Sequence, residues 1–228
     1  MIIDTHCHFD MMPQPEEYIR RKEASGDIVI GMTNLPSHFL MGVGYVRTCK
    51  HIRLALGLHP LLAAEGRGDL PLFKQQIDQT SYIGEIGLDF SREGYATKNA
   101  QIEVLRNVLG AIRGKKKLVS VHSRRAEREL LELLTEYEIE NVIFHWYSGP
   151  LTLVPEIVGH GYYFSINEAM TTSRNGQSVI SRIPRERILT ETDAPYNERC
   201  DIRRVLQVIG ISEQDVYGNF KRLLGALP

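Results

Sequence analysis

The chain has 228 residues, enough to bury a substantial core, and no compositional break divides it, so we expect one domain spanning residues 1–228. Hydrophobic residues make up 43% and charged residues 24%, and no apolar run approaches the roughly 20 residues of a membrane helix. We therefore expect no membrane partner. The formal net charge of −1 argues against a broad cationic surface for long duplex DNA, although it allows a local grip on a few phosphates.

The first residues, Met1 to His6, lack the basic start and the long apolar segment of a secretory signal. This predicts a cytoplasmic protein. The three cysteines, Cys7, Cys49 and Cys200, form no paired or CxxC spacing, which is typical of free thiols in a reducing compartment.

Short apolar runs alternate with segments of helical spacing along the chain. The runs predict eight β-strands, at residues 2–8, 28–34, 52–60, 82–89, 118–122, 142–147, 162–167 and 188–193. Helical spacing is clearest at residues 16–24, 101–112 and 127–137. Ser212 and Asp215 predict a capping box that begins a last helix, running through Leu224.

The repeated order of strand, helix and strand predicts parallel strands, and eight such units predict an α/β protein of the TIM-type (β/α)8 barrel class. A doubly wound sheet would show the same alternation, but it requires a glycine-rich phosphate turn after its first strand. The first strand here ends in His6-Cys7-His8-Phe9-Asp10 instead. We therefore predict the barrel, whose upper face collects the carboxyl ends of all eight strands.

Histidines and acids stand at the ends of five of the predicted strands. His6 and His8 are two residues apart, so alternation along a strand places both imidazoles on one side and Cys7 on the other. One metal ion can be held by both rings. On its own this pair fits equally well with two buried histidines that are satisfied by hydrogen bonds.

Two acids have small or apolar neighbours, which makes them expensive to bury without a positive partner. Glu85 stands in Gly-Glu-Ile-Gly, and Asp193 ends the eighth strand on the same face as Glu191. A metal ion would supply that partner; an arginine next to Glu85, or a helix capped by Asp193, are the structural alternatives. His122 and His145 each end an apolar strand, and either alone is more typical of a core histidine.

Taken together, six motifs in chain order resemble the TatD family of metal-dependent deoxyribonucleases, within the amidohydrolase-like metallohydrolases. They are D-T-H-C-H at 4–8, G-L-H-P at 57–60, G-E-I-G-L-D at 84–89, H-S-R at 122–124, H-W-Y-S-G at 145–149 and E-T-D-A-P-Y at 191–196. The resemblance implies two divalent metal ions. One is held by His6, His8, Glu85 and Asp193, and Glu85 bridges to a second, which is held by His122 and His145.

Two divalent ions roughly 3.5–4 Å apart lower the pKa of a shared water and neutralise the charge on a phosphodiester under attack. Asp193 could also accept the proton of that water, so Glu85 and Asp193 are the expected catalytic residues. Imidazole-rich ligation favours Zn²⁺ or Mn²⁺, and the carboxylates also admit Mg²⁺.

Other residues at the strand ends are candidates for binding substrate. We expect His59 and Arg124, with Arg125, to reach substrate phosphates, although a core histidine and surface arginines are equal interpretations. Trp146 and Tyr147 could stack on a nucleobase, and packing at the barrel rim is at least as well supported.

The leading hypothesis is a two-metal phosphodiesterase that trims single-stranded DNA from its 3′ end. The segment Ser91-Arg92-Glu93-Gly94, Pro150 and the short length resemble the TatD-like component of the Qat anti-phage systems, which would imply protein partners in a defence complex. One alternative is an amide, ester or aminoacyl-bond hydrolase on the same fold, although many such relatives carry a modified lysine at the fourth strand, where Glu85 stands here. Another is a non-catalytic assembly subunit that keeps the metal cluster.

Overall fold

Eight parallel β-strands form the centre of the computed structural model, which describes residues 1–197 and 200–225. Backbone pairing joins them into one sheet of order β1-β2-β3 and another of order β4-β5-β6-β7-β8. The strands are β1 (Ile3–Cys7), β2 (Ile28–Gly31), β3 (Ile52–Leu54), β4 (Tyr82–Gly87), β5 (Leu118–His122), β6 (Val142–His145), β7 (Tyr163–Ile166) and β8 (Ile188–Thr190). All eight predicted strands are present, with β5 at its predicted bounds and the others shorter.

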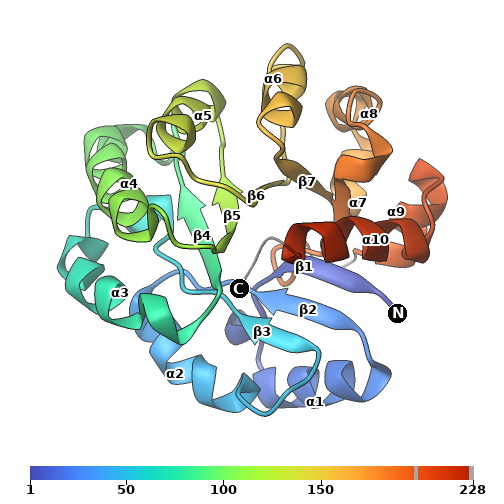
Figure 1. The fold of residues 1–228 in the computed structure, drawn as a ribbon, viewed down its shortest axis with the longest axis horizontal. Helices are drawn as coiled ribbons and strands as arrows, with labels where there is room; N and C mark the ends of the chain where they lie inside the picture. The colour runs from blue at the N-terminus through green and yellow to red at the C-terminus, as the bar shows by residue number, and fades with distance from the viewer. Residues whose placement is uncertain (198–199, 226–228) are drawn as a thin grey trace.

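The two sheets meet edge to edge at two seams. Between β3 and β4, Leu56 pairs with Ile83, and the backbone N–H of Leu58 donates to the carbonyl of Glu85 over 3.0 Å. Beyond β8, the N–H of Asp193 donates to the carbonyl of His6 over 2.9 Å. The predicted TIM-type barrel is therefore confirmed, with the strands around a common axis and the helices outside them (Figure 1).

The third strand is the one that differs most from its prediction. The chain stays extended after Leu54, but the N–H of Gly57 donates to the side-chain Oγ1 of Thr33 over 3.0 Å instead of to a strand carbonyl. A Cβ added to Gly57 would lie 1.7 Å from the Thr33 carbonyl oxygen, so only glycine allows this close approach. Because Gly57 bonds to a side chain, the regular strand ends before it. The extended chain still places His59 at the mouth of the barrel.

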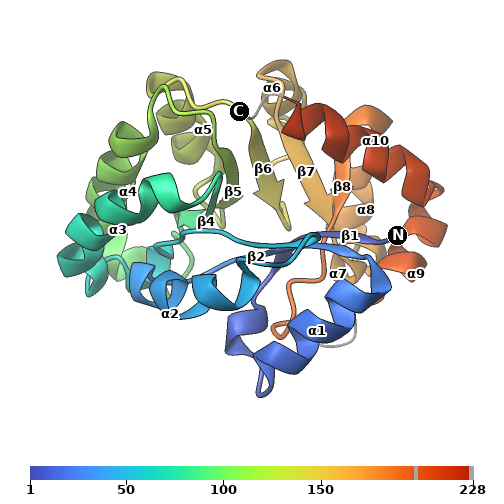
Figure 2. The ribbon, with the colours of Figure 1, turned by 60° about the horizontal axis from the view of Figure 1, so that its bottom comes forward.

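Ten helices are described, and Figure 2 shows them around the strands from a second direction. They are α1 (Pro15–Ser25), α2 (Pro36–Val46), α3 (Leu70–Gln76), α4 (Lys98–Ile112), α5 (Glu127–Glu136), α6 (Val154–Gly159), α7 (Glu168–Thr172), α8 (Arg174–Ile180), α9 (Ile202–Ile209) and α10 (Glu213–Leu224). The predicted capping box is confirmed, because Ser212 and Asp215 exchange side-chain to backbone hydrogen bonds at the start of α10. Among the described residues, no helix is long and apolar enough to cross a membrane.

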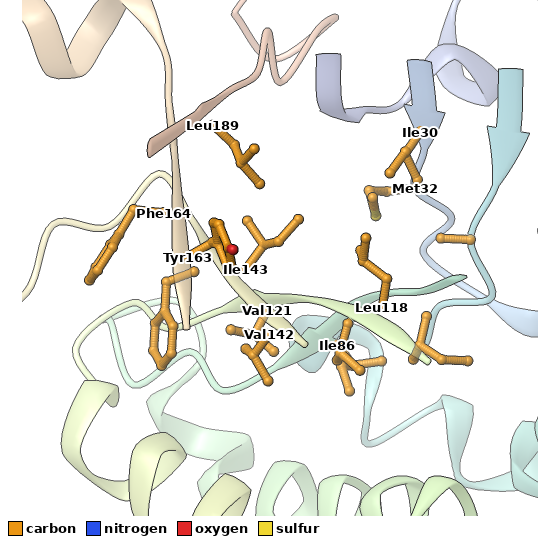
Figure 3. Close-up of a cluster of buried hydrophobic side chains, with 14 of the residues drawn as sticks. Ile30, Met32, Ile86, Leu118, Val121, Val142, Ile143, Tyr163, Phe164 and Leu189 are labelled. Carbon is orange, nitrogen blue, oxygen red and sulfur yellow. The ribbon is translucent and has the colours of Figure 1, made fainter. Parts of the chain in front are cut away.

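Apolar side chains fill the barrel below its carboxyl-terminal mouth. Ile30, Met32, Ile143 and Leu189 point toward one another from the β2, β6 and β8 segments, whereas Phe164 points away from them (Figure 3). All five are buried, and each such side chain contributes about 1.5–3 kcal/mol when removed from water. This packed apolar interior lies below the strand ends, whose polar groups lie at the mouth of the barrel above it. The extent of a single domain over residues 1–228 stays a prediction.

Candidate metal centre

The structure brings all six residues predicted to hold metal to the mouth of the barrel. The two oxygens of Glu85 face different partners. Oε2 lies 3.2 Å from His8 Nε2 and 3.6 Å from His6 Nε2, whereas Oε1 lies 2.8 Å from His122 Nδ1 and 2.7 Å from His145 Nε2. One buried carboxylate thus faces two pairs of imidazoles with its two oxygens.

The first set has the spacing of metal ligands. His6 Nε2 and His8 Nε2 are 3.2 Å apart, and Asp193 Oδ1 lies 3.7 and 3.8 Å from them. Atoms bound to one ion at about 2.0–2.2 Å lie about 3.0–3.5 Å from one another, so His6, His8 and Asp193 come close to the spacing that one metal ion needs. The nitrogen and oxygen donors fit a divalent cation such as Zn²⁺ or Mn²⁺.

Local strand geometry produces this arrangement. His6 and His8 point into the barrel, while Cys7 between them points outward and contacts the hydroxyl of Tyr18 over 3.4 Å. The ring of His6 stacks on that of His145, with centroids 3.8 Å apart and planes 11° from parallel. The alternation predicted for His6 and His8 is confirmed.

In the second set, a further carboxylate orients His122. Its Nε2 lies 2.9 Å from Oδ2 of Asp89, which is fully buried. Burial raises the pKa of Asp89, but hydrogen bonds from His122 and Ser91 outweigh it and bring that pKa to about 2. An ionised carboxylate behind an imidazole fixes the ring and makes it a better metal ligand. Asp89 was not predicted as a site residue, although it ends the motif at 84–89.

The protonation of the cluster also indicates that it attracts positive charge. Burial raises the pKa of Glu85, but electrostatic interaction with the rings of His59 and His145, with hydrogen bonds from His122 and His145, holds it well below its usual value. Burial lowers the pKa of His145, yet Glu85 and Glu191 together raise it well above normal. Burial raises the pKa of Asp193 to about 7. Protons occupy this cluster when cations do not, so the residues present fit a bound metal.

His59 lies as close to Glu85 as the predicted ligands do, with its Nε2 3.6 Å from Oε2. Burial lowers the pKa of His59 to about 4, so the ring is neutral. Its Nδ1 accepts the backbone N–H of Leu61 over 3.2 Å, so the ring proton must sit on Nε2. A protonated Nε2 is a hydrogen-bond donor, although His59, Glu85 and His122 also lie close enough together to hold a metal ion. The binding of substrate by His59 stays a prediction.

Gly87 sets the position of His122. It pairs with His122 across β4 and β5 at a φ of 141°, and an added Cβ would lie 2.0 Å from the His122 carbonyl oxygen. We expect Gly87→Ala to lower the free energy of unfolding by about 2–4 kcal/mol, through backbone strain and overpacking. Urea denaturation measures this loss. Gly44→Ala is the control, because its Cβ would meet nothing within 4 Å in helix α2 and should destabilise nothing. Equal stability of the two variants would contradict the prediction.

A cavity of about 700 Å³ opens above the cluster. Its wall includes the predicted substrate residues His59 and Arg124, together with Trp146. Tyr147 is not part of it, because that side chain is buried and its hydroxyl donates to the carbonyl of Pro150 over 2.8 Å. Rim packing is therefore the correct interpretation of Tyr147.

Tyr196 was not assigned a role from the sequence, yet it lines the cavity. Its ring lies edge-on to His8, with centroids 5.2 Å apart, and its hydroxyl is 3.3 Å from Nδ2 of Asn34. Its place in the motif at 191–196, just after a strand end, was the available signal.

Glu191 is a second residue near the site whose role was not predicted. It is fully buried and lies 3.7 Å from His145 Nδ1. Its carboxylate accepts hydrogen bonds from the backbone N–H of Trp146, from Asn167 Nδ2 and from Ser165 Oγ. These bonds hold the Glu191 side chain beside His145, and Glu191 belongs to the same motif as Asp193.

Comparison with known proteins identifies the family. The family described as TatD related DNase matches residues 3–210. The chain belongs to the TatD family. Membership makes it a metal-dependent hydrolase, as the resemblance of the six motifs implies.

Relatives and solved structures extend this result. The chain is 28% identical over 252 residues to human "Deoxyribonuclease TATDN3", covering 94% of this chain and 90% of that protein. It is 26% identical over 230 residues to an uncharacterised metal-dependent hydrolase of Methanocaldococcus jannaschii, with the same coverage of 94% and 90%. The structure of YjjV, a TatD homologue from Escherichia coli, superposes with a TM-score of 0.82 at 24% identity, covering 99% of this chain and 97% of that one. At this identity the superposition supports the fold alone.

Proposed function

We propose that this protein is a two-metal phosphodiesterase that acts on DNA. The observation that carries the proposal is the division of Glu85, whose Oε2 faces His6 and His8 while its Oε1 faces His122 and His145. A carboxylate with each oxygen directed at a separate set of imidazoles is suited to bridge two cations.

In this proposal His6, His8, Glu85 and Asp193 hold one ion, and Glu85, His122 and His145 hold the other. When bound, the ions, with Zn²⁺ or Mn²⁺ favoured, would activate water and neutralise charge on the phosphodiester. Asp193 Oδ accepts the proton released during attack, His59 donates its Nε2–H to a phosphate oxygen, and Arg124 pairs with the phosphate. Asp89 keeps the ring of His122 in place.

The substrate is proposed to be single-stranded DNA, trimmed from the 3′ end. Support comes from the family and from the deoxyribonuclease name of the human relative. Trp146 and Tyr196 place aromatic rings on the cavity wall, where an unpaired base can stack, and the net charge of −1 suits contact with a few nucleotides. A cytoplasmic location and work with partner proteins in phage defence belong to the same proposal.

A 5′-labelled single-stranded oligonucleotide tests this function directly. With Mn²⁺ we expect a ladder of products that shorten from the 3′ end, and with excess EDTA we expect no cleavage, because the ligand set would be empty of cations. A substrate with phosphorothioate linkages at its 3′ end is the control and should resist trimming. DNA cleavage that persists in EDTA would contradict the proposed metal dependence. Activity confined to amide and ester substrates would contradict the proposed substrate and favour the amide or ester hydrolase. An inactive protein that retains a stable partner would favour the assembly subunit.

A further inference from the structure

A second, smaller groove lies beside the catalytic cavity. Its volume is about 440 Å³, and its lining residues are Ser91, Arg92, Glu93, Arg124 and Arg125. Glu93 and Arg124 also line the larger cavity, so the two spaces adjoin. The groove is built from the loops that follow β4 and β5, which are neighbours in the barrel and lead into helices α4 and α5 (Figure 1).

The groove is positively charged, and its three arginine side chains form no salt bridge with the described residues. It presents three arginines against one glutamate, in a chain whose net charge is −1. Across residues 1–197 and 200–225, none of Arg92, Arg124 and Arg125 forms a salt bridge. Ser91 is only 5% exposed and is hydrogen-bonded to the neighbouring Asp89. Three exposed guanidinium groups that form no salt bridge with the described residues, gathered in one groove, offer paired hydrogen-bond donors to an anionic ligand.

The two loops are held firmly in place. The N–H of Phe90 donates to the carbonyl of Arg124 over 2.9 Å, which ties one loop to the other. Gln101, buried in α4, accepts the N–H of Asp89 and donates to the carbonyl of Gly94, each over 2.8 Å. A Cβ added to Gly94 would lie 2.1 Å from the Asp89 carbonyl oxygen, so the loop is closed tightly on itself. A rigid base reduces the entropy lost when the arginines bind a ligand.

We propose that this groove binds a backbone phosphate of the nucleic-acid strand, next to the phosphate held in the catalytic cavity. The inference rests on the proposed function, since it assigns the path of the strand beyond the scissile bond. Arginine forms paired hydrogen bonds with phosphate oxygens. The groove therefore gives the protein a preference for oligonucleotides, which carry a second phosphate, over substrates with a single phosphodiester.

The double variant Arg92→Ala/Arg125→Ala tests the groove through binding as well as turnover. We measure fluorescence anisotropy of a short single-stranded DNA oligonucleotide with EDTA-treated protein, in which cleavage is absent. The expected result is an affinity about tenfold weaker, and a salt dependence of log Kd that is shallower by about 0.7 for each phosphate that the variant no longer neutralises. With Mn²⁺ present, kcat/KM should fall about tenfold more on the oligonucleotide than on a dinucleotide, which lacks the second phosphate.

The matched control is Arg20→Ala/Arg47→Ala, which removes the same charge from exposed positions on α1 and just after α2, away from both spaces. It should bind and cleave as the native protein does. Equal affinity and equal salt dependence for the groove variant and the native protein would overturn the inference, even if both cleave DNA. Binding that depends on Arg92 and Arg125, in a protein that cleaves no DNA, would support the groove and contradict the nuclease. No binding by the native protein would overturn the inference.

Discussion

Glu85→Ala is expected to lower kcat/KM on single-stranded DNA by at least about 10³-fold, since each cation that Glu85 is proposed to bridge would stabilise the transition state by several kcal/mol. The variant should also lose both metal ions, because Glu85 is the only predicted ligand whose two oxygens face both imidazole sets. The fold should remain, because residues at the upper face of a barrel serve chemistry more than stability. Metal content by mass spectrometry and far-UV circular dichroism accompany the assay.

Glu132→Ala is the matched control, because it makes the same chemical change at an exposed position of α5. It should keep native metal content and activity. A Glu85→Ala protein that cleaves DNA at the native rate, or that retains two metals, would show that the bridge has been assigned to the wrong residue.

Asp193→Asn is expected to have the second largest effect. The amide oxygen preserves the shape of the side chain and an oxygen donor for the metal ion, and metal content by mass spectrometry checks that the ion is retained, but an amide cannot take up a proton at neutral pH. Loss of a general base lowers the rate by about 10²–10⁴-fold, so we expect kcat to fall by that factor. Affinity for the oligonucleotide should stay within a few-fold of native, because Asp193 is not among the residues proposed to contact the phosphates of the DNA.

Asp78→Asn provides the comparison, since Asp78 pairs with Lys115 on the surface near the start of β5, at the end of the barrel opposite the cluster. Its kcat should match that of the native protein. A native kcat in Asp193→Asn would mean that another group accepts the proton. A loss confined to KM would mean that Asp193 serves binding alone.

The barrel could be predicted from the sequence because its signals are local. Eight apolar runs separated by helical spacing define eight parallel strands, and alternation alone places His6 and His8 on one side of β1. The rule that strand ends converge then predicts that Glu85, His122 and Asp193 meet them, as the structure shows. The end of β3 could not be predicted. It depends on a hydrogen bond from the backbone N–H of Gly57 to the side chain of Thr33, just after β2, in place of a bond to a strand carbonyl.

The supporting residues of the site could not be predicted for a different reason. Asp89 and Glu191 act through contacts with His122 and His145, which lie on other strands, so their motifs place them near the site but do not reveal their partners. The role of His59 depends on which nitrogen carries the proton, and that is fixed by the backbone N–H of Leu61. Sequence order identifies which residues reach the mouth of the barrel, whereas the three-dimensional contacts decide what each one donates or accepts there.

The central claim is that Glu85 bridges two cations. Anomalous scattering from crystals soaked in Mn²⁺ tests it most directly. We expect two anomalous peaks on either side of Glu85, one next to His6, His8 and Asp193 and the other next to His122 and His145. A single peak away from Glu85, or no peak among these side chains, would contradict it.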